Sequence, residues 1–392
     1  MRILTFSTLF PHAANPIHGI FVGERLRHLV ASGAVEARVV APVPWFPVRH
    51  PRLNPYAHIG HQAPEHEFYH GIEVRHPRYV LIPKIGMSSA PLLLALGALN
   101  TIRNWMQEGF DFDLIDAHYF YPDGVAAWLL GQYLHKPVVI TARGSDLNQI
   151  PAHQIPRIMI RYVAKRAAGL ITVSAALQRV LLDMGIDETR ITVLRNGVDL
   201  ERFVPLDREA ERQRLGWQRP TLLSVGHLIE RKGHDRIVRA LPLLPDVGLA
   251  IIGAGPMEES LRQLTWDLGV AERVTFVGQV AQESLPRYYS AADLLVLASS
   301  REGWANVLLE AMACGLRVAA THVWGAPEVV TTPEAGGLIT ERTPEAIAMT
   351  VQDLLSIPAD RVATRRYAER FSWEATTQGQ IRLFQRVTGL NH

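Results

Sequence analysis

The chain has 392 residues, of which 48% are hydrophobic and 20% charged, a composition typical of a globular protein with two domains. Its 40 Lys and Arg residues barely outnumber its 38 Asp and Glu residues, which argues against a nucleic-acid partner. Cys314 is the only cysteine, so no intramolecular disulfide forms, and we expect it to be buried and inert in a reducing compartment.

The first residues predict a β-strand followed by a glycine-containing loop. Ile3–Ser7 is apolar, and the segment around it is too short and too polar for a signal peptide. A helix around 24–29 and a strand at 37–42 follow. Gly19 lies in the loop before this helix, where a flexible backbone lets the chain approach a phosphate. Residues 43–66, rich in Pro and His without periodicity, predict a long loop.

His66 and His70 match the zinc-binding pattern H-E-x-x-H, which requires a helix. Residues 68–75 instead alternate and turn at His70-Gly71, as in a β-hairpin. Side chains four residues apart on a strand are about 13 Å apart, too far to share a metal ion. We therefore reject a zinc site here.

Residues 91–107 predict an amphipathic, Leu-rich helix. Such a helix usually packs in a protein core. The alternative is peripheral contact of a cytoplasmic protein with the inner face of the membrane. No apolar stretch reaches the roughly 20 residues of a transmembrane helix.

Residues 114–118 predict a strand with acidic residues before it and a histidine at its end. Ligands of open α/β sheets bind at the carboxyl ends of the strands. Asp111 and Asp113, a D-x-D pattern, therefore lie at the wrong edge, whereas His118 lies at the right one. His118 is either a structural hydrogen-bonding residue or a proton-handling catalytic residue.

The strand predicted at 137–141 runs into Arg143-Gly144-Ser145-Asp146, which places a cation and a carboxylate at the same edge. Ser145 and Asp146 are equally well interpreted as an N-cap pair of the next helix. Residues 170–173 predict the last strand of this half, and Ser174 the N-cap of a helix at 175–184.

The second half repeats the alternation of strands and helices from 221 to 298, after an Asn-Gly turn at 196–197. We expect one domain at 1–197, a second domain at 198–370 and a C-terminal helix at 371–392. Gly226–Gly233 directly follows a predicted strand, so its Arg231 and Lys232 are candidate diphosphate clamps rather than surface charges. Gly253-x-Gly255 lacks the third glycine of a dinucleotide fingerprint.

Residues 301–314, REGWANVLLEAMAC, follow a predicted strand at 292–299 and predict a helix that begins near Ala305 and Asn306. Glu302 lies in the loop and Glu310 on the second turn. Taken alone, the pair is a loop charge and a solvated helix position. In a sheet of this kind, however, the amides of the first turn suit a phosphate, and the carboxylates suit hydroxyls of a sugar and a ribose.

This segment resembles the E-x7-E signature of the family 4 glycosyltransferases, retaining enzymes of GT-B architecture with two doubly wound, Rossmann-like α/β domains facing a central cleft. Arg317 departs from the signature, which usually has Pro there. The resemblance implies that 1–197 is the acceptor-side domain, that 198–370 is the nucleotide-sugar-binding domain and that the helix at 371–392 crosses back to the first domain. It also implies that the catalytic residues are His118, Glu302, Arg231 and Lys232, with Asp146 on the acceptor side. The implied donor-binding residues are Gly19, Arg143, Gly226, Gly253, Val277, Gly303, Trp304, Ala305, Asn306, Val307 and Glu310.

The function that the resemblance implies is retaining transfer of a sugar from a nucleotide diphosphate sugar to a hydroxyl acceptor. We expect a glycan or lipid-linked glycan of cell-surface polysaccharide synthesis as the acceptor. No cofactor or metal ion is expected, because the leaving diphosphate takes the acceptor's proton and protein cations stabilise it. The alternatives are a non-catalytic nucleotide-sugar-binding protein and a GT-B epimerase or phosphorylase.

Overall fold

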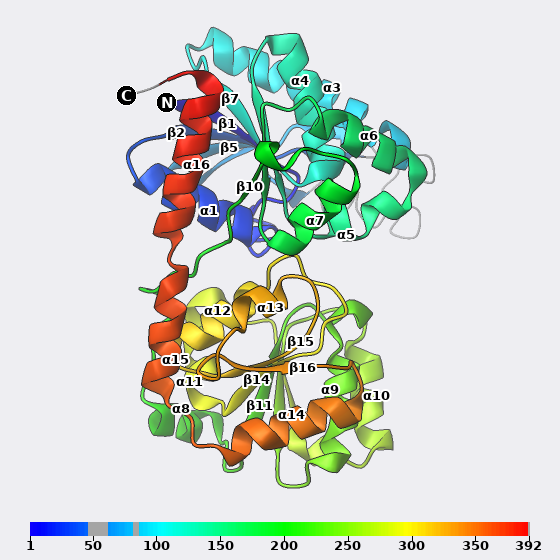
Figure 1. The fold of residues 1–392 in the computed structure, drawn as a ribbon, viewed down its shortest axis with the longest axis vertical. Coiled ribbons are helices and arrows are strands. Elements are labelled where there is room, and N and C mark those ends of the chain that lie inside the picture. The colour runs from blue at the N-terminus through cyan, green and yellow to red at the C-terminus, as the bar shows by residue number, and fades with distance from the viewer. Residues whose placement is uncertain (46–61, 81–85, 391–392) are drawn as a thin grey trace. The chain divides into compact units, whose positions relative to one another are not determined.

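The computed structural model describes residues 1–45, 62–80 and 86–390. They divide into two compact units: unit 1 combines Met1–Asn196 with Glu374–His392, and unit 2 is Gly197–Trp373 (Figure 1). Most of the long loop predicted at 43–66 lies outside the described residues.

Unit 1 is built on an eight-stranded sheet in the order β10-β9-β8-β7-β1-β2-β5-β4. All neighbours in it are parallel except β4 and β5. The strands are β1 (Arg2–Phe6), β2 (Glu36–Val40), β4 (His66–Tyr69), β5 (Ile72–Arg75), β7 (Leu114–His118), β8 (Val138–Ala142), β9 (Gly169–Thr172) and β10 (Ile191–Val193). A second, two-stranded sheet pairs β3 (Val43–Trp45) with β6 (Arg78–Val80). Because β1 lies between β2 and β7, the strand order reverses at the β1–β7 boundary.

Helices cover both faces of this sheet (Figure 1). They are α1 (Ile20–Ala31), α3 (Gly86–Gln107), α4 (Val125–Leu134), α5 (Ser145–Asn148), α6 (Gln154–Ala164), α7 (Ala175–Asp183) and α16 (Trp373–Thr388). The C-terminal helix α16 contributes Ile381, Leu383 and Phe384 to the same core as Val22 and Leu26 of α1. Unit 1 therefore closes its core with a helix from the far end of the chain.

Three local predictions for this half are confirmed. The segment with the H-E-x-x-H pattern is a β-hairpin, in which β4 and β5 pair antiparallel around His70 (φ 47°) and Gly71 (φ 81°). Asp111 and Asp113 lie at the amino edge of the sheet, where Asp113 Oδ2 accepts a hydrogen bond from the Arg2 amide. Ser174 caps α7, because its Oγ accepts a hydrogen bond from the Leu177 amide.

Unit 2 has a six-stranded parallel sheet in the order β13-β12-β11-β14-β15-β16. The strands are β11 (Thr221–Val225), β12 (Gly248–Ile252), β13 (Val274–Gly278), β14 (Leu294–Leu297), β15 (Val318–Thr321) and β16 (Gly336–Ile339). The helices are α8 (Arg208–Leu215), α9 (His234–Ala240), α10 (Glu258–Asp267), α11 (Leu285–Ala291), α12 (Asn306–Ala313), α13 (Ala326–Val329), α14 (Pro344–Ser356) and α15 (Arg361–Ala368). Numbered within the unit, the strands follow the 3-2-1-4-5-6 order of a Rossmann sheet.

Arg317 and Cys314 both have structural surroundings. Nη2 of Arg317 donates to the carbonyls of Leu354 (2.6 Å) and Ile357 (2.7 Å), so the residue that departs from the family signature caps the end of α14. Cys314 is buried, as predicted.

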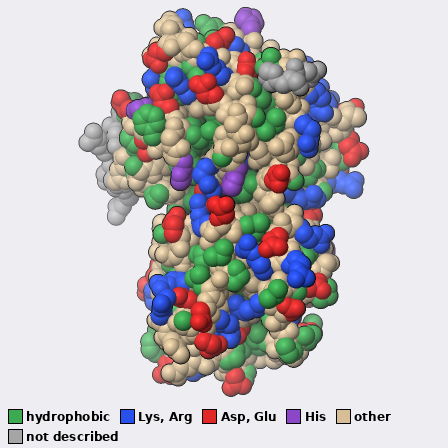
Figure 2. All heavy atoms as spheres, turned by 90° about the vertical axis from the view of Figure 1, so that its left-hand side faces the viewer, with side chains coloured by type: hydrophobic (Ala, Val, Ile, Leu, Met, Phe, Trp, Pro, Cys, Tyr) green, Lys and Arg blue, Asp and Glu red, His purple; other side chains and the backbone are tan. Residues whose placement is uncertain are grey.

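The surface shows no dominant charge on the face drawn in Figure 2, where basic and acidic side chains are interspersed. None of the described helices is long and apolar enough to span a bilayer.

Candidate functional site

The predicted donor-binding residues of unit 2 gather where its strand order reverses. The first strand, β11, pairs with both β12 and β14, so the loops after β11 and β14 leave the sheet side by side. In open α/β sheets, ligands bind at this switch point, outside the carboxyl ends of the strands. The loop after β11 carries Arg231 and Lys232, and the loop after β14 carries Glu302.

Lys232, Arg231 and Glu302 form one cluster at that switch point, in which Glu302 is buried and the two cations are partly exposed. Nζ of Lys232 donates to Oε1 of Glu302 at 2.7 Å, and Oγ of Ser299 donates to the same oxygen at 2.7 Å. The other carboxylate oxygen, Oε2, lies 3.7 Å from Nη1 of Arg231. The Glu302 side chain is 8% exposed, so this ion pair lies largely out of water.

Glu302 is an ionised carboxylate in this cluster. Burial by itself raises its pKa, but the charge and hydrogen bond of Lys232, then Arg231 and Ser299, outweigh burial and hold the pKa below its usual value. Two cations therefore surround one anion, and the cluster carries net positive charge.

Close backbone packing fixes the loops that present these charges. A Cβ on Gly253, whose φ is +141°, would lie 1.9 Å from the Gly226 carbonyl oxygen. A Cβ on Gly233 would lie 2.1 Å from the Ala298 carbonyl oxygen. The Gly253 amide also donates to the carbonyl of Gly278, next to Val277 at the end of β13. Glycine is required because the loops following three strands touch backbone to backbone.

Helix α12 begins at Asn306 after Ala305, as predicted, and the N-cap residue Ala305 makes no side-chain hydrogen bond to its first turn. Gly303 and Trp304 lie in the preceding loop, and Val307 in the first turn. Glu310 is 9% exposed, so the interpretation as a solvated position is wrong. Its Oε2 accepts a 2.9 Å hydrogen bond from the hydroxyl of Tyr289 on α11, which fixes the direction of the carboxylate.

Arg342 braces both motif loops and was missed by the sequence analysis. Its Nε donates to the Ala298 carbonyl at 2.7 Å, and its Nη2 donates to the Glu230 carbonyl at 3.0 Å. One guanidinium group thus ties the loop after β14 to the loop that carries Arg231 and Lys232. No motif signals this residue, because its partners are backbone carbonyls far away in the sequence.

In unit 1, His118 lies at the carboxyl end of β7, at the corresponding switch point, and is 1% exposed. Its Nε2 lies 3.1 Å from Oδ2 of Asp116, and its Nδ1 lies 2.6 Å from Nη2 of Arg143. A guanidinium group only donates, so Nδ1 accepts and the proton of the neutral ring is on Nε2, toward Asp116. The pKa of His118 is lowered to about 4, mainly by burial; Asp116 opposes this shift and Arg143 adds to it.

The network around His118 extends to the C-terminal helix. Nε2 of Gln380 on α16 donates to Oδ2 of Asp116 at 3.0 Å, and Oε1 of Gln380 accepts from Nε of Arg25 on α1 at 2.8 Å. Arg143 also donates to Oδ1 of Asn196 at 3.0 Å. The sequence analysis found His118 and Arg143 but not the residues that orient them.

Asp146 holds the loop that carries Arg143. Its oxygens accept from the amides of Phe120 (2.7 Å), Gly144 (2.6 Å) and Arg143 (3.1 Å). Helix α5 begins at Ser145 with Gly144 as its N-cap and without a capping side chain, so the predicted N-cap pair is wrong. The contact of Asp146 with an acceptor stays a prediction.

Gly19 positions a loop by close packing. Its φ is +63°, and a Cβ there would lie 2.3 Å from the carbonyl group of Leu9. The glycine therefore allows the loop after β1 to fold back on itself before α1. A contact of Gly19 with a donor stays a prediction.

Residues 21–202 match the family described as Glycosyltransferase Family 4, and residues 207–371 match the one described as Glycosyl transferases group 1. A D-inositol 3-phosphate glycosyltransferase of Geodermatophilus obscurus is 31% identical over 342 residues, which are 79% of this chain and 75% of that protein. The chain belongs to glycosyltransferase family 4.

Two further proteins are similar to this chain, one in sequence and one in fold. A GDP-mannose-dependent alpha-(1-6)-phosphatidylinositol monomannoside mannosyltransferase of Mycolicibacterium smegmatis is 36% identical over 248 residues, 58% of this chain. The chain spans 60% of that protein's length. The structure of a sucrose-phosphate synthase from Thermosynechococcus elongatus superposes with a TM-score of 0.77 at 20% identity, over 100% of this chain and 99% of that one. The predicted GT-B fold class is thereby confirmed.

Proposed function

We propose that this family 4 protein is a retaining glycosyltransferase that moves a sugar from a nucleoside diphosphate sugar to a hydroxyl of a glycan or lipid-linked glycan. The meeting of Arg231, Lys232 and Glu302 at the switch point of unit 2 carries the proposal. Fixed cations at that edge suit a departing diphosphate. The name of the mannosyltransferase relative makes GDP-mannose the first donor to test.

In the proposed reaction the acceptor oxygen bonds to the anomeric carbon, and the bond from that carbon to the β-phosphate oxygen breaks. The acceptor's proton passes to the departing diphosphate, so the balance needs no protein base. Lys232 and Arg231 stabilise the leaving charge, each by about 3 kcal/mol. Oε2 of Glu302 accepts from a sugar hydroxyl, and Glu310, oriented by Tyr289, accepts from the ribose.

This mechanism requires no metal ion, because side-chain cations occupy the role of a divalent ion at the diphosphate. Turnover should therefore be unchanged after dialysis against EDTA and unaffected by added Mg²⁺ or Mn²⁺. Loss of turnover with the chelator, restored by one of these ions, would remove metal independence from the proposal.

The decisive experiment measures nucleoside diphosphate release from a panel of nucleotide sugars with mannosyl and inositol acceptors, GDP-mannose first. NMR of the product reports whether the anomeric configuration is retained. Isomerised donor without acceptor would point to an epimerase, and sugar phosphate formed with inorganic phosphate would point to a phosphorylase. Donor binding without turnover over the whole panel would point to a binding protein.

We also propose that α6 contacts the membrane surface, where a lipid-linked acceptor would lie. Ile155, Ile158 and Tyr162 of this helix are 50%, 60% and 48% exposed. Every charged residue between 154 and 166 is basic. Exposed apolar side chains among cations are typical of helices that lie on anionic lipid. The sequence analysis gave membrane contact as the alternative for residues 91–107 and did not consider α6.

Vesicle sedimentation tests this contact. The protein should sediment with vesicles containing phosphatidylglycerol and remain in solution with pure phosphatidylcholine, and Ile158→Ser should weaken sedimentation. The control Met349→Ser changes an equally exposed apolar residue, 58% exposed, in α14 of unit 2. Equal sedimentation of the two variants would contradict the assignment to α6.

A further inference from the structure

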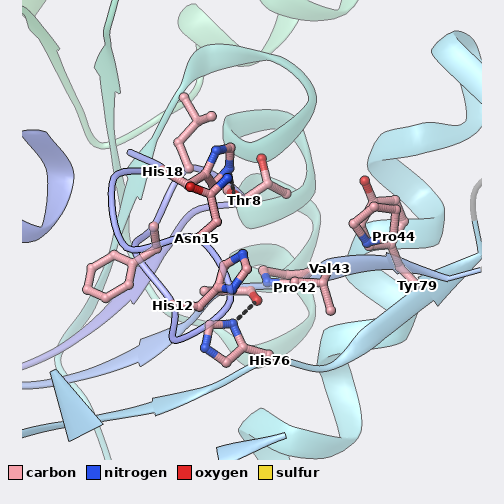
Figure 3. A pocket seen from close by; sticks show the side chains of 12 residues that line it. Thr8, His12, Asn15, His18, Pro42, Val43, Pro44, His76 and Tyr79 are labelled. Atoms are coloured by element: carbon pink, nitrogen blue, oxygen red, sulfur yellow. Dashed lines mark hydrogen bonds between the residues drawn. The ribbon is translucent and has the colours of Figure 1, made fainter. Parts of the chain in front are cut away.

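A small hollow opens beside the switch point of unit 1, where the chain leaves β1, β2 and β5 (Figure 3). It has a volume of about 180 Å³, below the roughly 300–1,000 Å³ of sites for drug-sized ligands, and suits a single ring. His12 and His18 come from the loop after β1, and His76 directly follows β5. No catalytic role assigned above uses these three side chains.

His12 is a buried side chain with an unused hydrogen-bonding atom. It is 5% exposed, and its Nδ1 has no hydrogen-bond partner among the described residues. Figure 3 shows its ring on the wall of the hollow, between those of His18 and His76. An unpaired polar atom at such a position is destabilising, and a ligand with a hydroxyl group would satisfy it.

The neighbouring rings are engaged by the protein itself. Nδ1 of His76 lies 3.0 Å from the Ala41 carbonyl, and its Nε2 lies 2.6 Å from Oε1 of Glu67, so each ring nitrogen faces an acceptor of the protein. Nε2 of His18 lies 3.0 Å from the Thr8 carbonyl. These bonds fix the walls of the hollow. Among the three histidines, they leave Nδ1 of His12 available to bind a ligand.

The hollow offers a ligand no unpaired charge, because His76 is paired with Glu67. Burial lowers the pKa of His12, and His76 and His18 lower it further. Burial also lowers the pKa of His18, against the opposing hydrogen bond to Thr8. Apart from the histidines, the described residues that line the hollow include no Lys, Arg, Asp or Glu. A phosphate or carboxylate would therefore find no unpaired cation, whereas neutral imidazole both donates to and accepts from hydroxyls.

One loop joins this hollow to the His118 network. Oγ of Ser7 donates to the His118 carbonyl at 3.2 Å, and Oγ of Thr8 donates to Oδ2 of Asp123 at 3.1 Å. Thr8 is itself part of the wall, together with apolar Leu9 and Phe10. A ring held here is fixed relative to the carboxyl edge at which His118 lies.

We propose that this hollow binds an uncharged, polyhydroxylated ring, a sugar or cyclitol unit of the acceptor, with Nδ1 of His12 as its hydrogen-bond partner. The C–H face of such a ring packs on Leu9, Phe10, Pro42 and Val43. That the ring belongs to the acceptor substrate rests on the proposed function. That the hollow binds such a ring does not. An acceptor ring that carries a phosphate has to place that group outside the hollow.

Saturation-transfer NMR on the full chain, with and without GDP, tests the proposal with methyl α-mannopyranoside and myo-inositol. Mannose 6-phosphate and myo-inositol 1-phosphate are the anionic counterparts. We expect transfer to at least one neutral ring, weaker transfer to its phosphorylated counterpart, and loss of transfer in His12→Phe, which fills the hollow. His12→Ala, which removes one hydrogen bond, should weaken binding about 2- to 12-fold. The control is His153→Phe at an exposed position of unit 1.

Three results would overturn the proposal. They are the absence of saturation transfer to both neutral rings, tighter binding of the phosphorylated rings, and unchanged ring binding in a folded His12→Phe variant. If ring binding depends on His12 but the protein transfers no sugar, the ring-binding site stands and the proposed function is wrong. If the protein transfers sugar and His12→Ala leaves the acceptor KM unchanged, the ring-binding site is wrong and the proposed function stands.

Discussion

Replacement of Lys232 by Met separates the structural and catalytic roles of the cluster in unit 2. The pair that it breaks is 2.7 Å long, with side chains 16% and 8% exposed. Without Lys232 the buried Glu302 carboxylate keeps only the more distant Arg231 as a cation, so stability should fall by less than the roughly 3–5 kcal/mol of a fully unpaired buried charge. Removing one positioned cation should also raise the barrier by about 3 kcal/mol, a loss in kcat of roughly 100-fold.

The double variant Lys232→Met/Glu302→Gln tells the two effects apart. In this variant a neutral amide replaces the buried Glu302 carboxylate. Urea unfolding should therefore show that most of the lost stability is restored. The rate of nucleoside diphosphate release should stay low, because the cation is still missing. Arg262→Met is the matched control, since its ion pair with Glu258 has side chains 46% and 39% exposed and contributes less than about 1 kcal/mol. A kcat for Lys232→Met within threefold of the wild type would refute the assignment of Lys232 as a diphosphate clamp.

Three further predictions concern the same two edges. Asp116→Asn should destabilise unit 1 by about 3–5 kcal/mol, because Asp116 is the buried anion between two buried guanidinium groups, and Asp113→Asn, at the opposite edge, should change urea unfolding far less. Gly253→Ala should destabilise unit 2 much more than Gly269→Ala in thermal melts, since both have positive φ but only the first places its Cβ 1.9 Å from a carbonyl oxygen. Burial, and then Lys232, lower the pKa of His234 to about 4, below the ordinary value of 6.5. The unfolded chain therefore binds the proton first as the pH falls, and stability is lost between pH 6.5 and pH 4. Urea melts at pH 7 and 4.5 should show a loss about 2 kcal/mol smaller in His234→Gln, and an equal loss would contradict this.

The rule that ligands bind at the carboxyl ends of parallel strands was sufficient to find the charged residues of unit 2. Short apolar runs predicted β11 and β14, and their carboxyl ends predicted that Arg231 and Lys232 would be near Glu302. The structure confirms these contacts because two adjacent parallel strands deliver their loops to one place. Local sequence patterns are enough to predict a site when the sheet topology brings the loops that carry its residues together.

Residues that act through distant partners were not predictable in this way. Gln380 and Asp116 lie 264 positions apart in the sequence, and Tyr289 meets Glu310 only because α11 packs beside α12. Arg342 recognises carbonyl groups, which every residue offers. Periodicity gives the face on which a side chain lies, but it does not give its partner on another element.

The placement of α16 has a consequence for synthesis on the ribosome. The strands of unit 1 emerge first, yet Phe384 and Gln380, which complete its core and its buried polar network, emerge only after all of unit 2 has been made. Domains generally fold in the order in which they leave the ribosome. Here the first unit to be translated is the last to be finished, and a nascent chain stalled before residue 374 exposes the apolar groove that α16 fills.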